Sequence, residues 1–391
     1  MTNEVLQKIA SDEQNISSSN GLEPLPKLRF LEFKNTYKKT KLNEAVERIQ
    51  RRDPTSEAPV MMLSAASGFI MQSEKYSREN AGQSLKKYIL LRKGELAYNH
   101  GASKYKPFGC CFELKEDEAR IPYVYHCFAV KENNDKSYIA RLLNNQKIDQ
   151  QLKRLISSSV RMDGLLNISY EEYTGIDLYL PSLLEQQKIA DFLFLVDRRI
   201  EKQRQLVESL KKYKRGALSR VFNDVLETVK LSDISNFISS ARTLSTTLNG
   251  NKGIYPVYDA AGIAGYIDYY DIDSDYITIV KDGSGVGRLQ KCDKKSSFIG
   301  TLGALVAKNC TTDFLYAVLQ TIDFSKFVTG MAIPHIYYRD YKSTLLPFPS
   351  EEKQHFISQL LKKFDIYIEN ETQKLTNMLA YKQGLLQQMF I

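Results

Sequence analysis

Two stretches of the chain carry hydrophobic residues at alternating steps of three and four, the spacing that lines up one side of a helix. The first runs from Leu193 to Val221 and the second from Leu361 to Met389. In each stretch the seam continues for about four heptads, which is typical of long helices that pair as a coiled coil. Each seam is also interrupted by polar residues at the same two places, which are Gln203 and Lys214 in the first stretch.

The second stretch repeats the first. Asp197, Ile200, Tyr213, Lys214, Gly216, Leu218 and Phe222 recur 168 positions later as Asp365, Ile368, Tyr381, Lys382, Gly384, Leu386 and Phe390. A copy of this kind indicates one structural unit used twice. We start the repeats at Pro181 and Pro347, and we expect one extra residue before Asp365, in the stretch from His355 to Phe364 of the second copy.

Outside these stretches the pattern changes to short apolar runs bounded by Gly, Pro and Asn, which favours strands. The exceptions are helices, which we expect over the second half of the basic stretch 27–52, over Tyr138 to Ser158 and over Phe314 to Phe327. The stretch TKLNEAV (Thr40 to Val46) has a weak echo in VKLSDIS (Val229 to Ser235). The chain is therefore expected to contain a mixed domain followed by a long helix, twice.

This organisation predicts an α+β fold with two mixed α/β domains separated by an antiparallel two-helix coiled coil, related by a pseudo-twofold internal repeat. The helices are expected to be antiparallel because the second domain begins where helix one ends and ends where helix two begins. The expected segments are a flexible leader at 1–26, the first domain at 27–180, the central helix at 181–222, the second domain at 223–346 and the C-terminal helix at 347–391.

The polar interruptions suggest a register for the paired helices. An antiparallel coiled coil pairs an a position with a d position. The predicted register pairs Val207 with Met378 and Leu210 with Leu375, and it places Lys214 beside Glu371 and Gln203 beside Lys382. It neutralises a charge in the seam; the alternative is that these side chains are solvated at a loose seam.

Composition narrows the class of protein. The chain has 391 residues, 43% of them hydrophobic, and a formal net charge of +8. This charge favours a nucleic acid or another polyanion as partner, although plain solubility also explains it. The five cysteines are odd in number and have no CxxC spacing, so we expect reduced thiols and a cytoplasmic protein. No apolar run is long enough to span a membrane.

The sequence contains few of the motifs that are typical of enzyme active sites. It has no HExxH, GxSxG or phosphate-binding loop motif, and its four histidines lack metal-ligand spacing. The stretch DGSGVGR (Asp282 to Arg288) follows the strand-like YITIV. Three interpretations remain for it: a glycine hairpin, a cofactor phosphate site, or a loop that touches the DNA backbone. The candidate DNA-binding residues here are Lys281, Ser284 and Arg288, with Tyr258 in the preceding YPVYDAAGIAGYIDYY.

The first domain contains a comparable stretch, YNHGASKYKPFG (Tyr98 to Gly109), in which aromatic and basic residues alternate. Asparagine and histidine side chains can read base edges, and lysines can hold phosphates. The alternative is an ordinary surface loop. The candidate DNA-binding residues are Asn99, His100, Ser103, Lys104, Tyr105 and Lys106.

The chain resembles the DNA specificity subunits of type I restriction–modification systems. The resemblance rests on EQQKIA and LKKYKRGALSRVF in the first repeat, YKQGLLQQMF in the second, and LPKLRFLEFK and YPVYDAAGIAGYIDYY elsewhere. It implies a reader without catalysis and without a cofactor of its own, whose two target-recognition domains each contact half of a split DNA sequence. The implied partners are DNA, two methyltransferase subunits that bind S-adenosylmethionine, and two restriction subunits.

Because the two domains differ in length and sequence, we expect an asymmetric DNA target with unlike halves. A coiled-coil scaffold with two protein-binding domains and no DNA role remains the main alternative. A methyltransferase in its own right is a third possibility, but the sequence lacks the Asn/Asp-Pro-Pro-aromatic motif of an amino-methyltransferase.

Overall fold

The computed structural model describes residues 25–75, 82–103, 106–156, 166–239, 248, 253–330 and 332–391. Contacts divide the chain into two compact units, the first made of Met1–Glu201 and Thr376–Ile391 and the second of Lys202–Leu375. The segments expected from the sequence keep each long helix whole, whereas the contacts assign part of each helix to each unit. The expected leader falls almost entirely outside the described residues.

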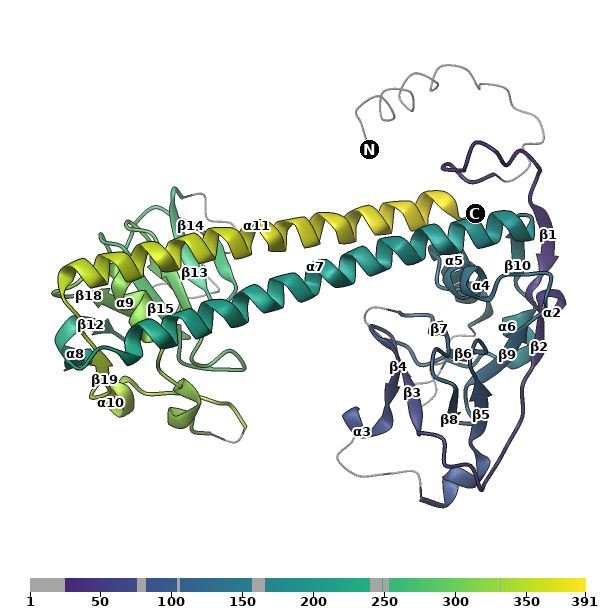
Figure 1. Cartoon of the computed structure of the whole chain (residues 1–391), viewed down its shortest axis with the longest axis horizontal. Helices are drawn as coiled ribbons and strands as arrows, with labels where there is room; N and C mark the ends of the chain where they lie inside the picture. The colour runs from purple at the N-terminus through teal and green to yellow at the C-terminus, as the bar shows by residue number, and fades with distance from the viewer. Residues whose placement is uncertain are drawn as a thin grey trace. The chain divides into compact units, whose positions relative to one another are not determined.

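The first unit contains a mixed domain and the beginning of a long helix (Figure 1). Its elements are β1 (Lys38–Lys41), α2 (Leu42–Ala45), β2 (Val46–Arg48), β3 (Met61–Ser64), β4 (Gly68–Met71), α3 (Gln72–Lys75), η1 (Gly82–Lys87), β5 (Ile89–Arg92), β6 (Leu96–Asn99), β7 (Cys110–Glu113), β8 (Glu118–Ile121), β9 (His126–Val130), α4 (Lys136–Leu142), α5 (Gln146–Leu155), α6 (Tyr170–Thr174) and β10 (Asp177–Leu180). The long helix α7 (Leu183–Asn223) follows and continues into the second unit.

The second unit contains the other mixed domain and most of the second long helix (Figure 1). Its elements are β11 (Thr228–Lys230), α8 (Leu231–Ile234), β12 (Ser235–Ile238), β13 (Tyr255–Asp259), β14 (Gly262–Ile267), β15 (Tyr276–Val280), β16 (Leu289–Cys292), β17 (Ser297–Phe298), β18 (Leu302–Ala307), α9 (Thr312–Leu319), η3 (Phe324–Phe327), α10 (Tyr338–Tyr341) and β19 (Leu345–Pro347). The helix α11 (Glu351–Met389) ends in the first unit.

The two mixed domains share one topology. Each has a four-stranded antiparallel sheet, in the order β2-β9-β6-β7 in the first unit and β12-β18-β15-β16 in the second. Each also has a two-stranded antiparallel sheet that pairs its first strand with its last, β1 with β10 and β11 with β19. The domains therefore repeat along with the helices, as the sequence predicted.

The echo between TKLNEAV and VKLSDIS reflects this repeat, because both stretches form a strand, one helical turn and a second strand. The expected helix in the second half of 27–52 was therefore wrong. Its apolar residues Leu42 and Ala45 are buried on a single turn, and the chain then returns to the sheet at Val46, which pairs with Val130. A β-branched residue favours the strand at this point.

The helix expected over Tyr138 to Ser158 is interrupted. Asn145 lies between α4 and α5, and its side chain accepts a hydrogen bond from the amide of Lys147 at 2.9 Å, capping α5. Asparagine competes with helical hydrogen bonding in this way and is a favourable N-cap. The helix expected over Phe314 to Phe327 likewise ends at Leu319, and a 3₁₀ turn, η3, follows.

The repeat runs in step from the last domain strand to the ends of the helices. In the first unit Gln186 donates to the carbonyl of Pro181 at 3.0 Å, and in the second Gln354 donates to the carbonyl of Pro349 at 2.9 Å. The repeat partner of Pro181 is therefore Pro349, and the extra residue expected before Asp365 is absent. Starting the second copy at Pro347 was an error of two positions, made because both residues are prolines.

Each unit buries its own part of the seam. In the first unit Ile189 and Leu193 lie in one core with Leu385 and Phe390 from the end of α11. In the second, Leu218 and Phe222 of α7 share a core with Ile357 and Leu361 of α11, together with residues of the sheet and α9. Each domain is thus fixed to the paired helices by a continuous hydrophobic core.

Candidate nucleic-acid interface

The two loops singled out in the sequence occupy the same place in the two domains. The first connects β6 to β7 and the second connects β15 to β16, and these are the third and fourth strands of the equivalent sheets. In both, the carbonyl of the first residue after the strand accepts a backbone hydrogen bond. Leu166 donates to His100 at 2.9 Å, and Ile336 donates to Lys281 at 2.9 Å. Two independently chosen stretches thus prove to be topological equivalents.

Side-chain hydrogen bonds hold the described part of the β6–β7 loop in place. The side-chain oxygen of Asn99 accepts from the amide of Gly101 at 2.9 Å, and the Ser103 hydroxyl accepts from the amide of Lys106 at 3.0 Å. The ammonium of Lys106 donates to the carbonyl of Asn144 at 2.9 Å. Lys104 and Tyr105, the remaining candidates in this loop, lie outside the described residues.

His100 is a structural residue in this conformation. Its ring is 6% exposed, and its nitrogens lie 2.8 Å from the carbonyl of Leu166 and 3.0 Å from that of Val124. The ring also stacks on His126 with centroids 5.1 Å apart. Both nitrogens are occupied, so this side chain is not placed to read a base edge. Burial lowers the pKa of the neighbouring His126 to about 4.

The DGSGVGR stretch forms a glycine hairpin, the simplest of the three interpretations. Gly283 and Gly287 have φ angles of 97° and 84°, a region that favours glycine. The amide of Gly287 donates to the carbonyl of Val280 at 2.9 Å, and that of Arg288 donates to Gly285 at 3.0 Å. These amides are committed to the turn, which argues against a nest of free donors around a cofactor phosphate.

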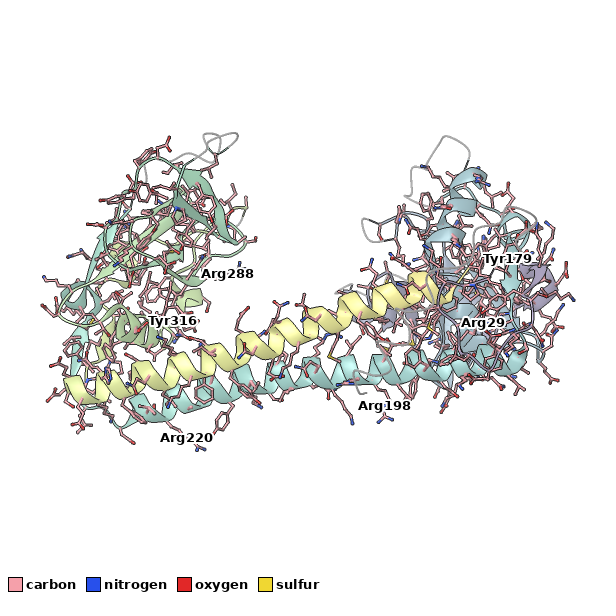
Figure 2. The ribbon with its side chains drawn as sticks, turned by 90° about the horizontal axis from the view of Figure 1, so that it is seen from above. Arg29, Tyr179, Arg198, Arg220, Arg288 and Tyr316 are labelled. Atoms are coloured by element: carbon pink, nitrogen blue, oxygen red, sulfur yellow. The ribbon has the colours of Figure 1, made fainter. Side chains whose placement is uncertain are left out.

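The side chains of this β15–β16 turn differ in what they offer. Ser284 and Arg288 are exposed, and Arg288 (Figure 2) donates to the carbonyl of Ala260 at 3.2 Å. The ammonium of Lys281 donates to the carbonyl of Ser239 at 2.5 Å. Tyr258, in contrast, is only 5% exposed and its hydroxyl donates to Asp293 at 3.3 Å, so its role here is structural.

A second segment packs against this turn, and sequence reasoning missed it. Gly283 donates to the carbonyl of Pro334 at 2.9 Å, and His335 forms a β-bridge with Asp282. The segment exposes Ile333 and Tyr337, at 66% and 45% of their surfaces. The guanidinium of Arg339 lies 4.6 Å from the ring centroid of Tyr337.

The in-step repeat could have revealed this segment from the sequence, because it is the repeat equivalent of the segment that packs beside the β6–β7 loop in the first unit. Isoleucine recurs as Ile168 and Ile336, and the aromatic pair Tyr170 and Tyr173 recurs as Tyr338 and Tyr341. The second member of each pair is buried, with 0% of Tyr173 and 1% of Tyr341 exposed. The segment that leads into Tyr338 is therefore held by the core, which leaves residues such as Tyr337 to face outward.

The register predicted for the paired helices is wrong. Lys214 binds Asp365 at 2.5 Å rather than Glu371. The amide of Gln203 donates to the Glu371 carboxylate at 2.7 Å rather than lying beside Lys382, which binds Asp197 at 2.6 Å. The helices are thus displaced by about one heptad from the predicted register.

The observed register has a clear electrostatic reason. Asp197 and Asp365 are repeat equivalents, and so are Lys214 and Lys382, so the same ion pair forms once in each unit. The predicted register neutralised only one of the two lysines. Val207 is 3% exposed, as a seam residue should be, while Leu210, Leu375 and Met378 are half-buried. The displacement also applies to the predicted pairings of Val207 with Met378 and of Leu210 with Leu375, which are therefore wrong as well.

The described residues also bear on metal binding and on membranes. Among the residues that the structure describes, no group of three His, Cys, Asp or Glu side chains is arranged to hold a metal ion. Within the same part of the chain, no helix combines the length and the apolar character that crossing a membrane requires.

Comparison with known proteins identifies relatives. Residues 223–379 match the family model of the type I restriction modification DNA specificity domain. A Mycoplasma pneumoniae protein named as a type I specificity subunit is 29% identical over 151 residues, which is 37% of this chain and 49% of the relative. The specificity subunit of the Escherichia coli type I restriction enzyme EcoprrI is 27% identical over 115 residues, 29% of this chain and 28% of that protein. The chain thus spans half or less of these curated relatives.

The fold has a counterpart among solved structures. The specificity subunit of a type I restriction–modification system from M. genitalium superposes with a TM-score of 0.58, at 15% identity, over 94% of this chain and 99% of that one. Together with the sequence matches, this confirms the family resemblance and the mixed two-domain fold class with paired helices that the sequence predicted.

Proposed function

We propose that this chain, a relative of type I specificity subunits, is the DNA-reading subunit of a type I restriction–modification complex. Each mixed domain reads one half of a split target, and the chain itself performs no catalysis. The observation that carries the proposal is the equivalence of the β6–β7 loop and the β15–β16 turn. A protein that reads two half-sites of DNA needs a polar, basic loop in each of two domains. The two loops here occupy the same position in the two copies of a duplicated fold.

In the second unit, the residues proposed to contact DNA are the exposed Ser284 and Arg288 with the half-buried Lys281, joined by the exposed Tyr337 and Arg339 from the neighbouring segment. Lysine and arginine hold phosphates, while tyrosine and arginine also offer planar groups to bases. In the first unit the candidates that remain are Asn99, Ser103, Lys104, Tyr105 and Lys106.

The target is proposed to be asymmetric. The first domain adds the two-stranded sheets β3–β4 and β5–β8, whereas the second adds the three-stranded sheet β14-β13-β17. The turn in the second domain is a glycine hairpin, while the first domain has a longer loop between Asn99 and Cys110. Two domains that share a four-stranded sheet but differ in their added sheets and loops favour a target whose two halves differ in sequence.

The proposed partners are two methyltransferase subunits, which supply S-adenosylmethionine and methylate an adenine in each half-site, and two restriction subunits. The target adenine must leave the base stack to be methylated, which is chemistry for the partner and not for this chain. We place the complex in the cytoplasm, where DNA is accessible and where cysteines such as the buried Cys110 and Cys111 remain reduced.

The decisive experiment is methylation mapping in cells that carry the chain with its partners. We expect modified adenines in a split, non-palindromic sequence. Replacing Lys281, Ser284 and Arg288 together should change or abolish recognition of one half-site and leave the other half of the motif unaltered. A palindromic target would contradict the assignment of unlike half-sites.

A scaffold without a DNA role gives a different result in a simpler assay. If the chain reads DNA, its affinity for duplex DNA falls steeply with salt, because phosphate contacts release counterions. Absence of any salt-dependent binding by the assembled complex would reject the DNA-reading function.

A further inference from the structure

A short hairpin with an apolar tip lies next to the β15–β16 turn. It runs from Thr329 to His335, and the amide of each of these two residues donates to the carbonyl of the other, at 2.9 Å and 2.8 Å. At the tip Ile333 is exposed over 66% of its surface, beside the half-buried Pro334. Met331 lies outside the described residues. The two described side chains have no polar atom, so they can make only apolar contacts with a partner.

The backbone fixes this hairpin in place. The amide of Gly283, in the β15–β16 turn, donates to the carbonyl of Pro334 at 2.9 Å. Gly330 has a φ angle of 89°, and a Cβ atom there would collide with the carbonyl oxygen of Ile333, so this position requires glycine. Ordering these residues costs conformational entropy, which the exposed Ile333 side chain does not offset by its own burial. The conformation is therefore suited to a partner that covers Ile333.

The charges beside Ile333 favour DNA as this partner. The turn to which the hairpin is fixed carries two cations, Lys281 and Arg288, against one carboxylate, Asp282. Within the described part of the chain neither cation forms an ion pair, and each donates to a backbone carbonyl instead. An apolar residue next to cations that the chain does not neutralise fits a polyanion that also presents apolar atoms.

A DNA duplex offers two kinds of apolar group to a residue such as Ile333. The faces of the bases are covered by their neighbours, so a side chain reaches them only by unstacking a base step, which costs free energy. The C5-methyl group of thymine lies at the edge of the major groove and is accessible without any distortion of the duplex. The methyl group is therefore the apolar target that Ile333 reaches at the lower cost.

We propose that Ile333 is a specificity-determining residue that packs against the C5-methyl group of one thymine in the half-site read by the second domain. This inference rests on the proposed function and adds an apolar contact to the charged and hydrogen-bonding residues of the turn. Ser284 and Arg288 bond to polar groups of the DNA, whereas Ile333 selects thymine by its methyl group. Loss of the methyl group should therefore have the same effect as loss of the isoleucine side chain.

Deoxyuridine tests this contact, because it pairs as thymidine does but lacks the methyl group. The assembled complex is titrated against a duplex that carries the target found by methylation mapping, with binding followed by fluorescence anisotropy. Each thymine of the second half-site is replaced by deoxyuridine, one at a time. For the wild-type complex one of these replacements should lower affinity by about three- to tenfold, the loss expected for one apolar methyl contact, and the others should change it by less than about twofold.

Ile333→Ala completes a double-mutant cycle between protein and DNA. This variant should bind the thymine duplex as weakly as the wild type binds the sensitive deoxyuridine duplex, and it should no longer distinguish the two. Leu345→Ala is the matched control, because it removes a similarly exposed aliphatic side chain from β19 of the same unit and should discriminate as the wild type does. In cells, Ile333→Ala should accept other bases at that one position of the methylated motif and leave the first half of the motif unchanged.

Several results would overturn the methyl contact while leaving the proposed function intact. One is a wild-type complex that binds every deoxyuridine duplex as tightly as the thymine duplex, and another is an Ile333→Ala variant that still distinguishes them. Tighter wild-type binding to a duplex with a mismatch at one step, lost in Ile333→Ala, would indicate insertion between bases instead. Impaired assembly of Ile333→Ala with its partner subunits, with base discrimination retained, would indicate that a protein covers Ile333. Absence of any salt-dependent DNA binding by the wild type would reject the proposed function, and this inference with it.

Discussion

Gln203 and Glu371, which are 168 positions apart in the sequence, contact each other directly. The Gln203 amide donates to the Glu371 carboxylate at 2.7 Å and to its backbone carbonyl at 3.0 Å. Because 168 is also the spacing of the repeat, each residue meets its own equivalent in the other copy. Because the helices are antiparallel, a residue can lie beside its own repeat equivalent at only one position along the pair, and Gln203 and Glu371 mark that position. The ion pairs Asp197–Lys382 and Lys214–Asp365 are repeat equivalents of each other.

Replacing Gln203 with glutamate should make stability depend strongly on pH. In the wild-type chain, hydrogen bonds from Lys374 and Gln203 lower the pKa of Glu371. The folded pKa then lies below the unfolded one, so this contribution is present above the unfolded pKa and is lost as pH falls through the folded pKa. In Gln203→Glu two adjacent carboxylates repel each other, which raises the pKa of the pair.

Thermal unfolding across pH checks this. The Gln203→Glu variant should be less stable than wild type at pH 7 and should recover part of the difference below about pH 5, as one carboxylate of the pair becomes protonated. Gln203→Met, which removes the hydrogen bond without adding a charge, serves as the control. A constant difference between Gln203→Glu and wild type at all pH values would contradict the carboxylate contact.

The Lys214–Asp365 ion pair can be tested by charge exchange. Lys214 is only 12% exposed, so Asp365→Ala should leave a poorly hydrated charge and destabilise the chain by about 1–2 kcal/mol. Exchange of both residues, Lys214→Asp with Asp365→Lys, should recover at least half of the loss caused by either reversal alone. A double-mutant cycle in denaturant measures the coupling. If Lys214 coupled to Glu371 instead, the originally predicted register would be right.

Glu185 should be important for the stability of the first unit. Its side chain is 1% exposed and binds Arg29 at 2.7 Å and the hydroxyl of Tyr37 at 3.1 Å. Glu185→Ala leaves a mostly buried guanidinium unpaired, so we expect a loss of about 3 kcal/mol in the free energy of unfolding. The repeat equivalent Lys353 is a matched control, and Lys353→Ala should change that free energy by less than about 0.5 kcal/mol.

Removing the charge at Arg288 should weaken DNA binding without changing the fold. Arg288→Ala should lower affinity by about three- to tenfold and reduce the slope of log affinity against log salt by about one. Lys230→Ala removes an exposed charge of the same unit from β11 and should leave both quantities unchanged. An identical salt slope for Arg288→Ala and wild type would place Arg288 outside the interface.

Stability should also fall at mildly acidic pH because of His126. Burial holds the pKa of His126 near 4, below the value of about 6.5 expected in the unfolded chain. The unfolded state therefore binds a proton more readily, and stability is lost as pH falls from about 6.5 towards 4. His126→Gln should show a smaller loss over this interval, as measured by chemical denaturation at several pH values.

The sequence predicted the long helices and the two-fold repeat well because seam periodicity and spacing are properties of the chain itself. It did not predict the register, since several alignments of two apolar seams bury similar surface and the choice depends on ions such as Asp197. The burial of His100 and Tyr258 also escaped prediction. A polar residue next to a glycine turn looks the same in the sequence whether its hydrogen bonds go to solvent or, as for His100, to the carbonyls of Leu166 and Val124.

The two-stranded sheets β1–β10 and β11–β19 have a consequence for how such chains diversify. In each domain the incoming and outgoing strands lie side by side, as Lys39 opposite Tyr179 and Val229 opposite Leu346 show. A domain whose two ends are adjacent can be replaced without moving the helices that carry it. Recombination within these short strands would exchange a whole mixed domain, and under the proposed function it would give the lineage a new DNA target in one step.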